Sequence, residues 1–319
     1  MRLLAVAVAC IALSACLAGA AQAAALPTRL FKRVINGFLM PKSLAPYGVS
    51  VTRYDAHGML YLCGGTIISP NHVLTAAHCI YNSTSQINPA NTFEIGYGSM
   101  NKTQQKTVRA TEVHPHPSYL VNNNVNGIYD MAVIRVPTLP FNANTALIPI
   151  YMGPIQPLQS LMAMGWGITE PTAVVRTVLR GVLAITGSVK DCQGFVSSFQ
   201  THDGPQVCTI GNLTPDRTTC SGDSGSAVVI NNNGVVQLAG LNSVGLYHGA
   251  MSCGAADSAH FYTHPAFHID FIVKATGLPK SFFASQSTKG VEIGNQAAVT
   301  TVIKTVVVLP SNMPQLPLY

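Results

Sequence analysis

The serine of "TTCSGDSGSA", residues 218–227, lies between glycines in a pattern that suits either a catalytic nucleophile or an ordinary tight turn. A serine hydroxyl becomes a good nucleophile only when a base within hydrogen-bond reach accepts its proton. A carboxylate must in turn hold that base in the useful tautomer. If Ser224 is a nucleophile, the chain must therefore supply a histidine and an acid elsewhere.

Two other motifs supply them. "LTAAHCIY" carries His78 at the end of an apolar run and beside Cys79, and "GIYDMAVIRV" carries Asp130 at the head of an apolar run. Taken alone, the histidine is a common loop residue and the aspartate a common turn former. A lone carboxylate at the head of a buried strand is costly, however, unless it accepts hydrogen bonds. In the chain order His, Asp, Ser, the three residues are predicted to form a catalytic triad.

The N-terminus has the features of a secretory signal peptide. Arg2 precedes an apolar run that begins at Leu3, and small residues end at 21–23 with the pattern A-x-A. We expect residues 1–23 to be removed and the protein to be secreted into the extracellular space. The segment 13–16 also resembles a bacterial lipoprotein box, so a cell-envelope protein with a lipid anchor on Cys16 is the alternative. No other stretch reaches the length of apolar sequence that a membrane span needs.

The composition is that of a globular protein with few charges. The chain has 319 residues, of which 48% are hydrophobic and 9% charged, so it can bury a large core while its polar loops stay uncharged. Four of its 18 Lys and Arg residues lie in the first 33 positions, which leaves 14 against 12 acidic residues. Because no basic cluster remains, nucleic acid is not an expected partner.

Cysteine usage agrees with export. Two of the cysteines, Cys10 and Cys16, lie in the signal peptide, and an even number remains, which predicts three disulfides with about 15 pairings possible from the sequence alone. No C-x-x-C pair occurs, so a metal site is not predicted. No cofactor is expected. The remaining cysteines are Cys63, Cys79, Cys192, Cys208, Cys220 and Cys253.

Short apolar runs broken by Gly, Asn and Pro predict an antiparallel all-β fold, either a barrel or a sandwich. "INNNGVV" is typical of a hairpin turn. A helix is expected near 264–277, where apolar residues recur at helical spacing up to Gly277. Residues 280–319 differ in character and are interpreted as an extra strand, a tail, or a partner-binding or processed segment. The predicted strands lie within 47–54, 59–69, 91–99, 130–136, 160–168, 178–185 and 226–245.

From residue 33 to about 278 the chain resembles the chymotrypsin/trypsin family of serine endopeptidases. The resemblance is carried, in order, by "RVING", "CGGTIIS", "LTAAHC", "HPHPSY", "YDMAVIRV", "MGWG", "CSGDSG" and "FYTHPAFHIDFI". It implies two packed six-stranded antiparallel β-barrels, with the catalytic groups between them and a short C-terminal helix. The expected division is a propeptide at 24–33, a protease domain at 34–279 and an extension at 280–319. Within the protease domain, the barrels would span about 34–150 and 151–279.

The resemblance also implies a role for each residue of the site. Ser224 would be the nucleophile, His78 the general base and then acid, and Asp130 the group that orients the imidazole. The backbone N–H groups of Gly222 and Ser224 would form the oxyanion hole. The implied disulfides are Cys63–Cys79, Cys192–Cys208 and Cys220–Cys253.

Activation is expected at the dibasic site in "RLFKRVING". An activating protease would cut after Arg33, and the new ammonium of Val34 would pair with the buried carboxylate of Asp223. The chain would then be a zymogen. The alternative is that Lys32 and Arg33 are only solvent-exposed basic residues and are not a cleavage site.

The resemblance places the floor of the specificity pocket at Thr218. A threonine cannot pair with Lys or Arg, so protein and peptide substrates with these residues before the cut are not expected to be preferred. His260 stands where many relatives have glycine. It either narrows the pocket, or when protonated attracts an acidic side chain, or points away. The other pocket positions are Ser243, Val244, where tryptophan is usual, and Gly245.

Two other functions compete with the endopeptidase. A catalytically weak or inactive binding or adhesion protein on the same scaffold is the main alternative, prompted by His260, Val244 and the C-terminal extension. An esterase of the α/β-hydrolase type is disfavoured because "GDSGS" lacks the G-x-S-x-G spacing and the acid and histidine precede the serine. Glycosylation triplets occur at Asn82, Asn101 and Asn212, all in stretches that are expected to be loops.

Overall fold

The computed structural model describes residues 37–54, 58–119, 127–167, 177–249 and 253–284. The expected signal peptide and propeptide, Cys16, Arg33 and Val34 lie outside these residues, as does residue 285 onward of the C-terminal extension. Within the described ranges, no helix is long and apolar enough to cross a membrane.

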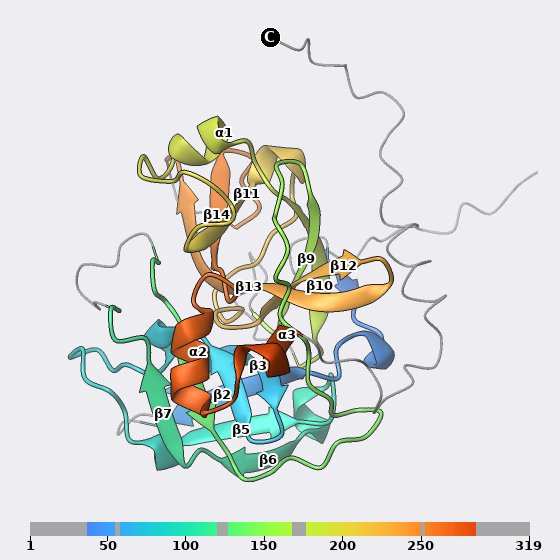
Figure 1. The fold of residues 1–319 in the computed structure, drawn as a ribbon, viewed down its shortest axis with the longest axis vertical. Helices are drawn as coiled ribbons and strands as arrows, with labels where there is room; N and C mark the ends of the chain where they lie inside the picture. Colours follow the sequence, from blue (N-terminus) through green and yellow to red (C-terminus); the bar gives the residue numbers. More distant parts are fainter. Residues whose placement is uncertain (1–36, 55–57, 120–126, 168–176, 250–252, 285–319) are drawn as a thin grey trace, which may run out of the picture. The chain divides into compact units, whose positions relative to one another are not determined.

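The first sheet is antiparallel throughout and nearly closes on itself (Figure 1). Its edge strands β6 and β7 are separated by only two residues. Ala110 donates its N–H to Phe93 of β5, and Thr111 donates to Arg135 of β8. The two edges therefore act as one bent strand, and the sheet forms a six-stranded barrel. Its order is β6 (Lys106–Arg109), β5 (Phe93–Tyr97), β2 (Gly48–Tyr54), β3 (Leu60–Ser69), β4 (His72–Thr75), β8 (Ala132–Arg135) and β7 (Glu112–Pro115).

The second sheet is also antiparallel, and an isolated bridge between Thr186 and Thr209 links β10 to β11 at its two sides. Strand β1 has two residues and adds to the outside of β10, so six longer strands make the barrel. The order is β1 (Phe38–Leu39), β10 (Arg180–Ile185), β9 (Ser160–Gly165), β12 (Ala227–Asn232), β13 (Val235–Tyr247), β14 (Ser258–Thr263) and β11 (Gln206–Ile210). The prediction of two six-stranded antiparallel barrels is confirmed.

Local sequence explains most of these strands. Each apolar run predicted as a strand contains one, and "INNNGVV" forms the hairpin between β12 and β13. Its central residues Asn233 and Gly234 have φ of 51° and 90°. Asparagine and glycine tolerate this left-handed backbone, and such turns match the twist of the flanking strands.

In the part of the chain that the structure describes, three α-helices accompany the sheets. α2 (Ile269–Thr276) lies inside the predicted helical segment and ends at Gly277, which has φ of 72° and caps the helix in the left-handed conformation. α1 (Val189–Gln193) begins with a capping box formed by Ser188 and Asp191. α3 (Lys280–Ala284) belongs to the segment that was expected to extend beyond the protease domain. Short 3-10 turns occur at Lys42–Leu44, Ala77–Cys79, Ala90–Thr92, Lys102–Gln104 and Gly211–Leu213.

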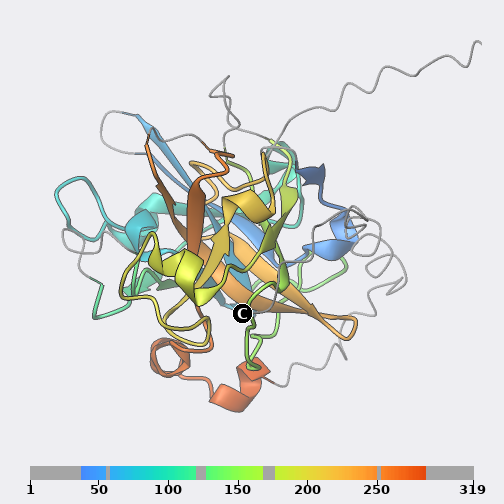
Figure 2. The same ribbon diagram turned by 90° about the horizontal axis from the view of Figure 1, so that it is seen from above.

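The two ends of the described chain each pack on the barrel that is remote in sequence. β1 pairs with β10 of the second sheet, whereas α2 contacts β8 of the first. α3 contacts α2, and both lie at one side of the second view (Figure 2). Phe283 is fully buried, and its carbonyl accepts a hydrogen bond from the N–H of Ile150 at 2.9 Å. The packed body of the protein therefore continues past the expected boundary at 279.

One apolar cluster joins the two sheets. It contains side chains from the first sheet, such as Leu74 and Val133, from the second, such as Val229 and Leu241, and from both C-terminal helices. Separate clusters fill the inside of each barrel. Loops between strands at this junction are thus held by apolar packing on both sides.

Replacing Phe283 by alanine should test whether α3 is part of the folded body. Because its ring is fully buried in the shared cluster, we expect a loss of about 3 to 5 kcal/mol in the free energy of unfolding, measured by urea denaturation. The neighbouring Phe282 is only partly buried, so Phe282→Ala should cost less. Equal, small losses for both variants would show that α3 does not contribute to the core.

Candidate active site

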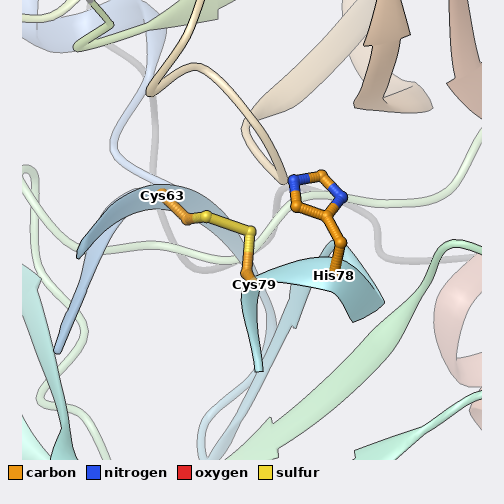
Figure 3. A group of neighbouring side chains, drawn as sticks. All are labelled: Cys63, His78 and Cys79. Carbon is orange, nitrogen blue, oxygen red and sulfur yellow. A yellow bond between two sulfur atoms is a disulfide. The ribbon is translucent and has the colours of Figure 1, made fainter. Parts of the chain in front are cut away.

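His78 is held by covalent and secondary structure together. It lies in the 3-10 turn Ala77–Cys79 that follows β4, and the next residue forms a disulfide with Cys63 of β3. Figure 3 shows the imidazole beside this disulfide. His78 and the two sulfur atoms are close enough together to suggest a metal site. Both sulfurs are bonded to each other, however, so they offer no thiolate to a metal ion.

Asp130 sits in a strained turn just before β8. The preceding residue, Tyr129, has φ of 62°, which is unusual for a residue with a bulky side chain. Its ring stacks on that of His116 with centroids 4.8 Å apart, and Met131 donates its N–H back to the carbonyl of Tyr129. The surrounding packing thus compensates for the backbone strain and fixes the direction of the carboxylate.

The carboxylate of Asp130 is almost fully buried and is surrounded by donors. One oxygen accepts the backbone N–H of His78 at 2.9 Å, and the other lies 2.7 Å from Nδ1 of the same residue. Ser243 of β13 donates its hydroxyl to that second oxygen at 2.6 Å. Because an ionised carboxylate only accepts hydrogen bonds, Nδ1 of His78 must carry the proton. Nε2 is then left as the basic nitrogen.

Electrostatics reinforce this arrangement. Burial alone would lower the pKa of His78, but the charge of Asp130 and its hydrogen bond outweigh burial and raise it. Burial alone would raise the pKa of Asp130, but the charge of His78 and the hydrogen bonds from His78 and Ser243 lower it instead. The pair is therefore a carboxylate and a base whose protonated form is stabilised.

The loop that carries Ser224 is docked on the first sheet. The carbonyl of Ser224 accepts the N–H of Gly64 of β3 at 2.8 Å and lies 3.9 Å from Sγ of Cys79. A side chain on Gly64 would collide with Ser226, and Gly225 has φ of 75°. Glycine at these positions lets the loop approach β3 closely. Ser224 thus lies beside the turn that carries His78, although no hydrogen bond joins the two side chains.

Two backbone N–H groups next to the serine are available to a ligand. Among the described residues, neither Gly222 nor Ser224 donates its N–H to another group. Gly222 has φ of 92°, and a Cβ there would lie 3.1 Å from the Cα of Gly167, so only glycine fits without strain. Free, adjacent amides of this kind can stabilise an oxyanion.

Asp223, the residue before the serine, is buried and held by backbone amides. Its carboxylate accepts the backbone N–H groups of Gly167 and Cys220, each at 2.7 Å, and is 1% exposed. Burial raises its pKa to about 7, although these two hydrogen bonds act in the opposite direction. Within the described ranges no lysine, arginine or histidine forms an ion pair with it.

A pocket of about 180 Å³ opens beside Ser224. Of the five predicted pocket positions, Ser243, Val244, Gly245 and His260 line it, but Thr218 does not. The pocket also includes residues that were not predicted, notably Tyr247 and Thr219. Position in the sequence could have indicated Tyr247, because it lies two residues beyond Gly245 on the same strand and so faces the same side.

The imidazole of His260 determines the chemical character of the base of this pocket. Its Nε2 lies 2.5 Å from the hydroxyl of Thr218, which is buried, and its ring is almost fully buried. Burial lowers the pKa of His260 to about 4, so the imidazole is neutral at pH 7. His260 lines the pocket and so does not point away from it.

The three disulfides that the resemblance implies are all present: Cys63–Cys79, Cys192–Cys208 and Cys220–Cys253. Two of them hold the site directly. The first joins β3 to the turn of His78, and the third ties the loop before Ser224 to the wall of the pocket.

Comparisons with known proteins agree with this geometry. The family model described as Trypsin matches residues 34–269. Trypsin 5G1 of Aedes aegypti is 26% identical over 249 residues, which cover 77% of this chain and 86% of that protein. Kallikrein 1-related peptidase b24 of Mus musculus is 29% identical over 245 residues, with coverage of 72% and 85%. Trypsin I-P1 of Gallus gallus is 28% identical over 215 residues, with coverage of 67% and 79%.

Replacing Asp130 by asparagine should reverse the sign of the pKa shift at His78. The variant loses the charge that raises the pKa of His78, while burial of the ring still lowers it. We therefore expect the pKa of His78 to fall below its ordinary value, as measured by the pH titration of its ring protons by NMR.

Ser243→Ala is the matched control for that titration. It removes one hydrogen bond to Asp130 but leaves the carboxylate, so the pKa of His78 should stay above its ordinary value. An unchanged pKa in the asparagine variant would contradict the proposed charge interaction.

Proposed function

Because the chain belongs to the trypsin family of serine proteases, we propose that it is a secreted endopeptidase that is made as a zymogen and cuts peptide bonds through Ser224, His78 and Asp130. The observation that carries this proposal is the buried carboxylate of Asp130, 2.7 Å from Nδ1 of His78, with the serine loop docked against the same turn.

In the first half of the reaction, Nε2 of His78 takes the proton of the Ser224 hydroxyl while Oγ forms a bond to the substrate carbonyl carbon. The carbonyl oxygen becomes an oxyanion and accepts hydrogen bonds from the N–H groups of Gly222 and Ser224. His78 then gives its proton to the leaving amine as the C–N bond breaks, which produces the acyl-enzyme.

In the second half, His78 takes a proton from water, and the hydroxide oxygen bonds to the acyl carbon. When the C–Oγ bond breaks, the proton returns to Ser224 and the acid product leaves. Asp130 keeps its negative charge throughout, because its task is to hold Nδ1–H and stabilise the imidazolium.

The edge of β13 beside the pocket suits an extended substrate. β12 pairs with β13 as far as Leu241, beyond which β13 pairs only with β14, up to Tyr247. This leaves one side of residues 243–247 without a neighbouring strand in the described structure. A peptide can add there as an antiparallel strand and deliver the side chain before the cut to the pocket.

Activation would follow from the electrostatics of Asp223. Its pKa of about 7 lies above the ordinary 3.8, so between these values the folded chain holds a proton that the unfolded chain has released. This group therefore lowers stability as the pH rises through that window. Cleavage after Arg33 supplies the ammonium of Val34. This ammonium can pair with the Asp223 carboxylate and so offset the free-energy cost of burying its charge.

The pocket's acid, Asp223, is already bound by two backbone amides, and this lack of a free acid explains the expected selectivity. A lysine or arginine side chain would be buried beside a neutral His260 and without a carboxylate to pair with, since Asp223 faces Gly167 and Cys220. Substrates with a basic residue before the cut are therefore disfavoured.

Labelling with a fluorophosphonate tests the nucleophile. The chain, once cut after Arg33, should become covalently labelled at Ser224, and Ser224→Ala should abolish both labelling and peptidase activity. In comparable enzymes, removal of the serine lowers kcat by about 10⁶-fold. Ser226→Ala, in the same loop, is the control and should still be labelled. A folded, processed chain that fails to react would instead support the inactive binding protein.

Replacing Arg33 by glutamine tests activation. If the ammonium of Val34 is needed, Arg33→Gln should resist an arginine-specific protease at this site and remain unreactive towards the fluorophosphonate. N-terminal sequencing of the wild-type product should begin at Val34. Full reactivity of the uncleaved variant would show that the chain is not a zymogen.

A further inference from the structure

The imidazole of His260 is part of the inner wall of the pocket. His260 lies on β14 directly opposite Gly245 of β13. A Cβ built on Gly245 would lie 2.9 Å from the hydroxyl of Tyr247 and 3.0 and 3.1 Å from Cε1 and Nδ1 of His260, so the phenol and this edge of the imidazole both border the space that the missing side chain leaves. Glycine at 245 therefore keeps Nδ1 accessible from the pocket.

The other nitrogen is fixed by Thr218. The hydroxyl of Thr218 is buried and, among the described residues, its only hydrogen-bond partner is Nε2 of His260. If Nε2 carried the proton, the proton of the hydroxyl would have no acceptor, and a buried donor without an acceptor is costly. The favoured arrangement has Thr218 donating to Nε2. In a neutral imidazole the proton then sits on Nδ1.

Nδ1–H is therefore a hydrogen-bond donor directed into the pocket. It makes no hydrogen bond within the described part of the chain, and it is not among the buried atoms that lack a partner, so it is reachable from the pocket. The donor belongs to a neutral group, since burial lowers the pKa of His260 to about 4.

The pocket holds no fixed charge that could neutralise a charged side chain. Its lining residues include no lysine or arginine, and its carboxylate, Asp223, is already bound by two backbone amides. Its remaining titratable side chains are the phenols Tyr247 and Tyr262, the latter hydrogen-bonded to Thr209. The site thus offers a neutral donor in neutral surroundings.

We propose that His260, held in one tautomer by Thr218, selects substrates whose side chain before the cut ends in a carboxamide, glutamine or asparagine. The side-chain carbonyl oxygen accepts the hydrogen bond from Nδ1–H. His260 is then a specificity-determining residue, and Thr218 is a positioning residue that acts through it. This proposal rests on the proposed protease function.

Other side chains fit this environment less well. Methionine has about the length of glutamine but accepts only weakly, so the buried donor would lose its water without gaining a partner. A glutamate carboxylate can accept the hydrogen bond, but its charge would be buried without a cation. The ammonium of lysine would likewise be buried without an opposite charge. It can also only donate hydrogen bonds, as Nδ1–H does.

The experiment compares peptides that differ only before the cut, with Gln, Glu, Met, Ala or Lys, on the processed chain at neutral pH. The readout is the ratio of kcat/KM for Gln to that for Met. We expect a ratio of about tenfold in the wild type, the size of one hydrogen bond. Thr218→Val keeps the shape of Thr218 but releases the tautomer, so the ratio should fall towards one. Thr218→Ser retains the hydroxyl and should keep the wild-type ratio of kcat/KM.

Two further variants complete the test. His260→Phe fills a similar volume without the donor and should also abolish the preference for glutamine. Thr209→Val removes a buried hydroxyl from the strand next to His260 and serves as the matched control, with the wild-type ratio expected. Because the readout is a ratio, a general loss of activity in a variant does not affect it.

The outcomes separate this proposal from the one it rests on. A processed chain that does not react with a fluorophosphonate contradicts the protease function itself. A chain that reacts but cleaves after Met, Ala or Lys at least as well as after Gln overturns the role of His260 alone. A preference for Glu over Gln would contradict the proposal that His260 is a neutral donor and would indicate a charged imidazolium instead. A wild-type ratio in Thr218→Val would overturn the role of Thr218.

Discussion

The site depends on one buried carboxylate that is shared by two barrels. Asp130 and His78 come from the first barrel, whereas Ser243, which donates to the same carboxylate, comes from the second. The backbone of Asp130 is held in the same way, because Thr263 of β14 donates its hydroxyl to the Asp130 carbonyl at 2.8 Å. Because donors from both barrels bind Asp130, the position of the imidazole is coupled to the packing of the barrels.

The packing of each end of the described chain against the barrel that is remote in sequence supports that coupling. The first strand of the described chain joins the second sheet, and α2 packs against the first. Each barrel is therefore covered by residues from the other end of the chain. The serine loop adds a third connection, since it belongs to the second barrel yet its Ser224 carbonyl is bound by Gly64 of the first. The site is made of three segments that are distant in sequence, and contacts between the two barrels keep it rigid.

Much of this could be predicted from the sequence. The strands appear as apolar runs bounded by turn residues, and the glycines of "CGGT" and "GDSG" match positions where the loop and β3 approach closely. Other features depend on long-range contacts. α3 has no amphipathic pattern of its own and forms because Phe283 enters the shared core. The role of His260 was open, because the sequence cannot show that Thr218, 42 residues away, would meet its ring.

The most direct test is the tautomer of His78 in the neutral enzyme. With Asp130 ionised and accepting from Nδ1, the ¹⁵N chemical shifts above the pKa of His78 should show the proton on Nδ1 and a bare Nε2. Shifts that place the proton on Nε2 would mean that the carboxylate does not hold the ring and that Nε2 is not free to act as the base.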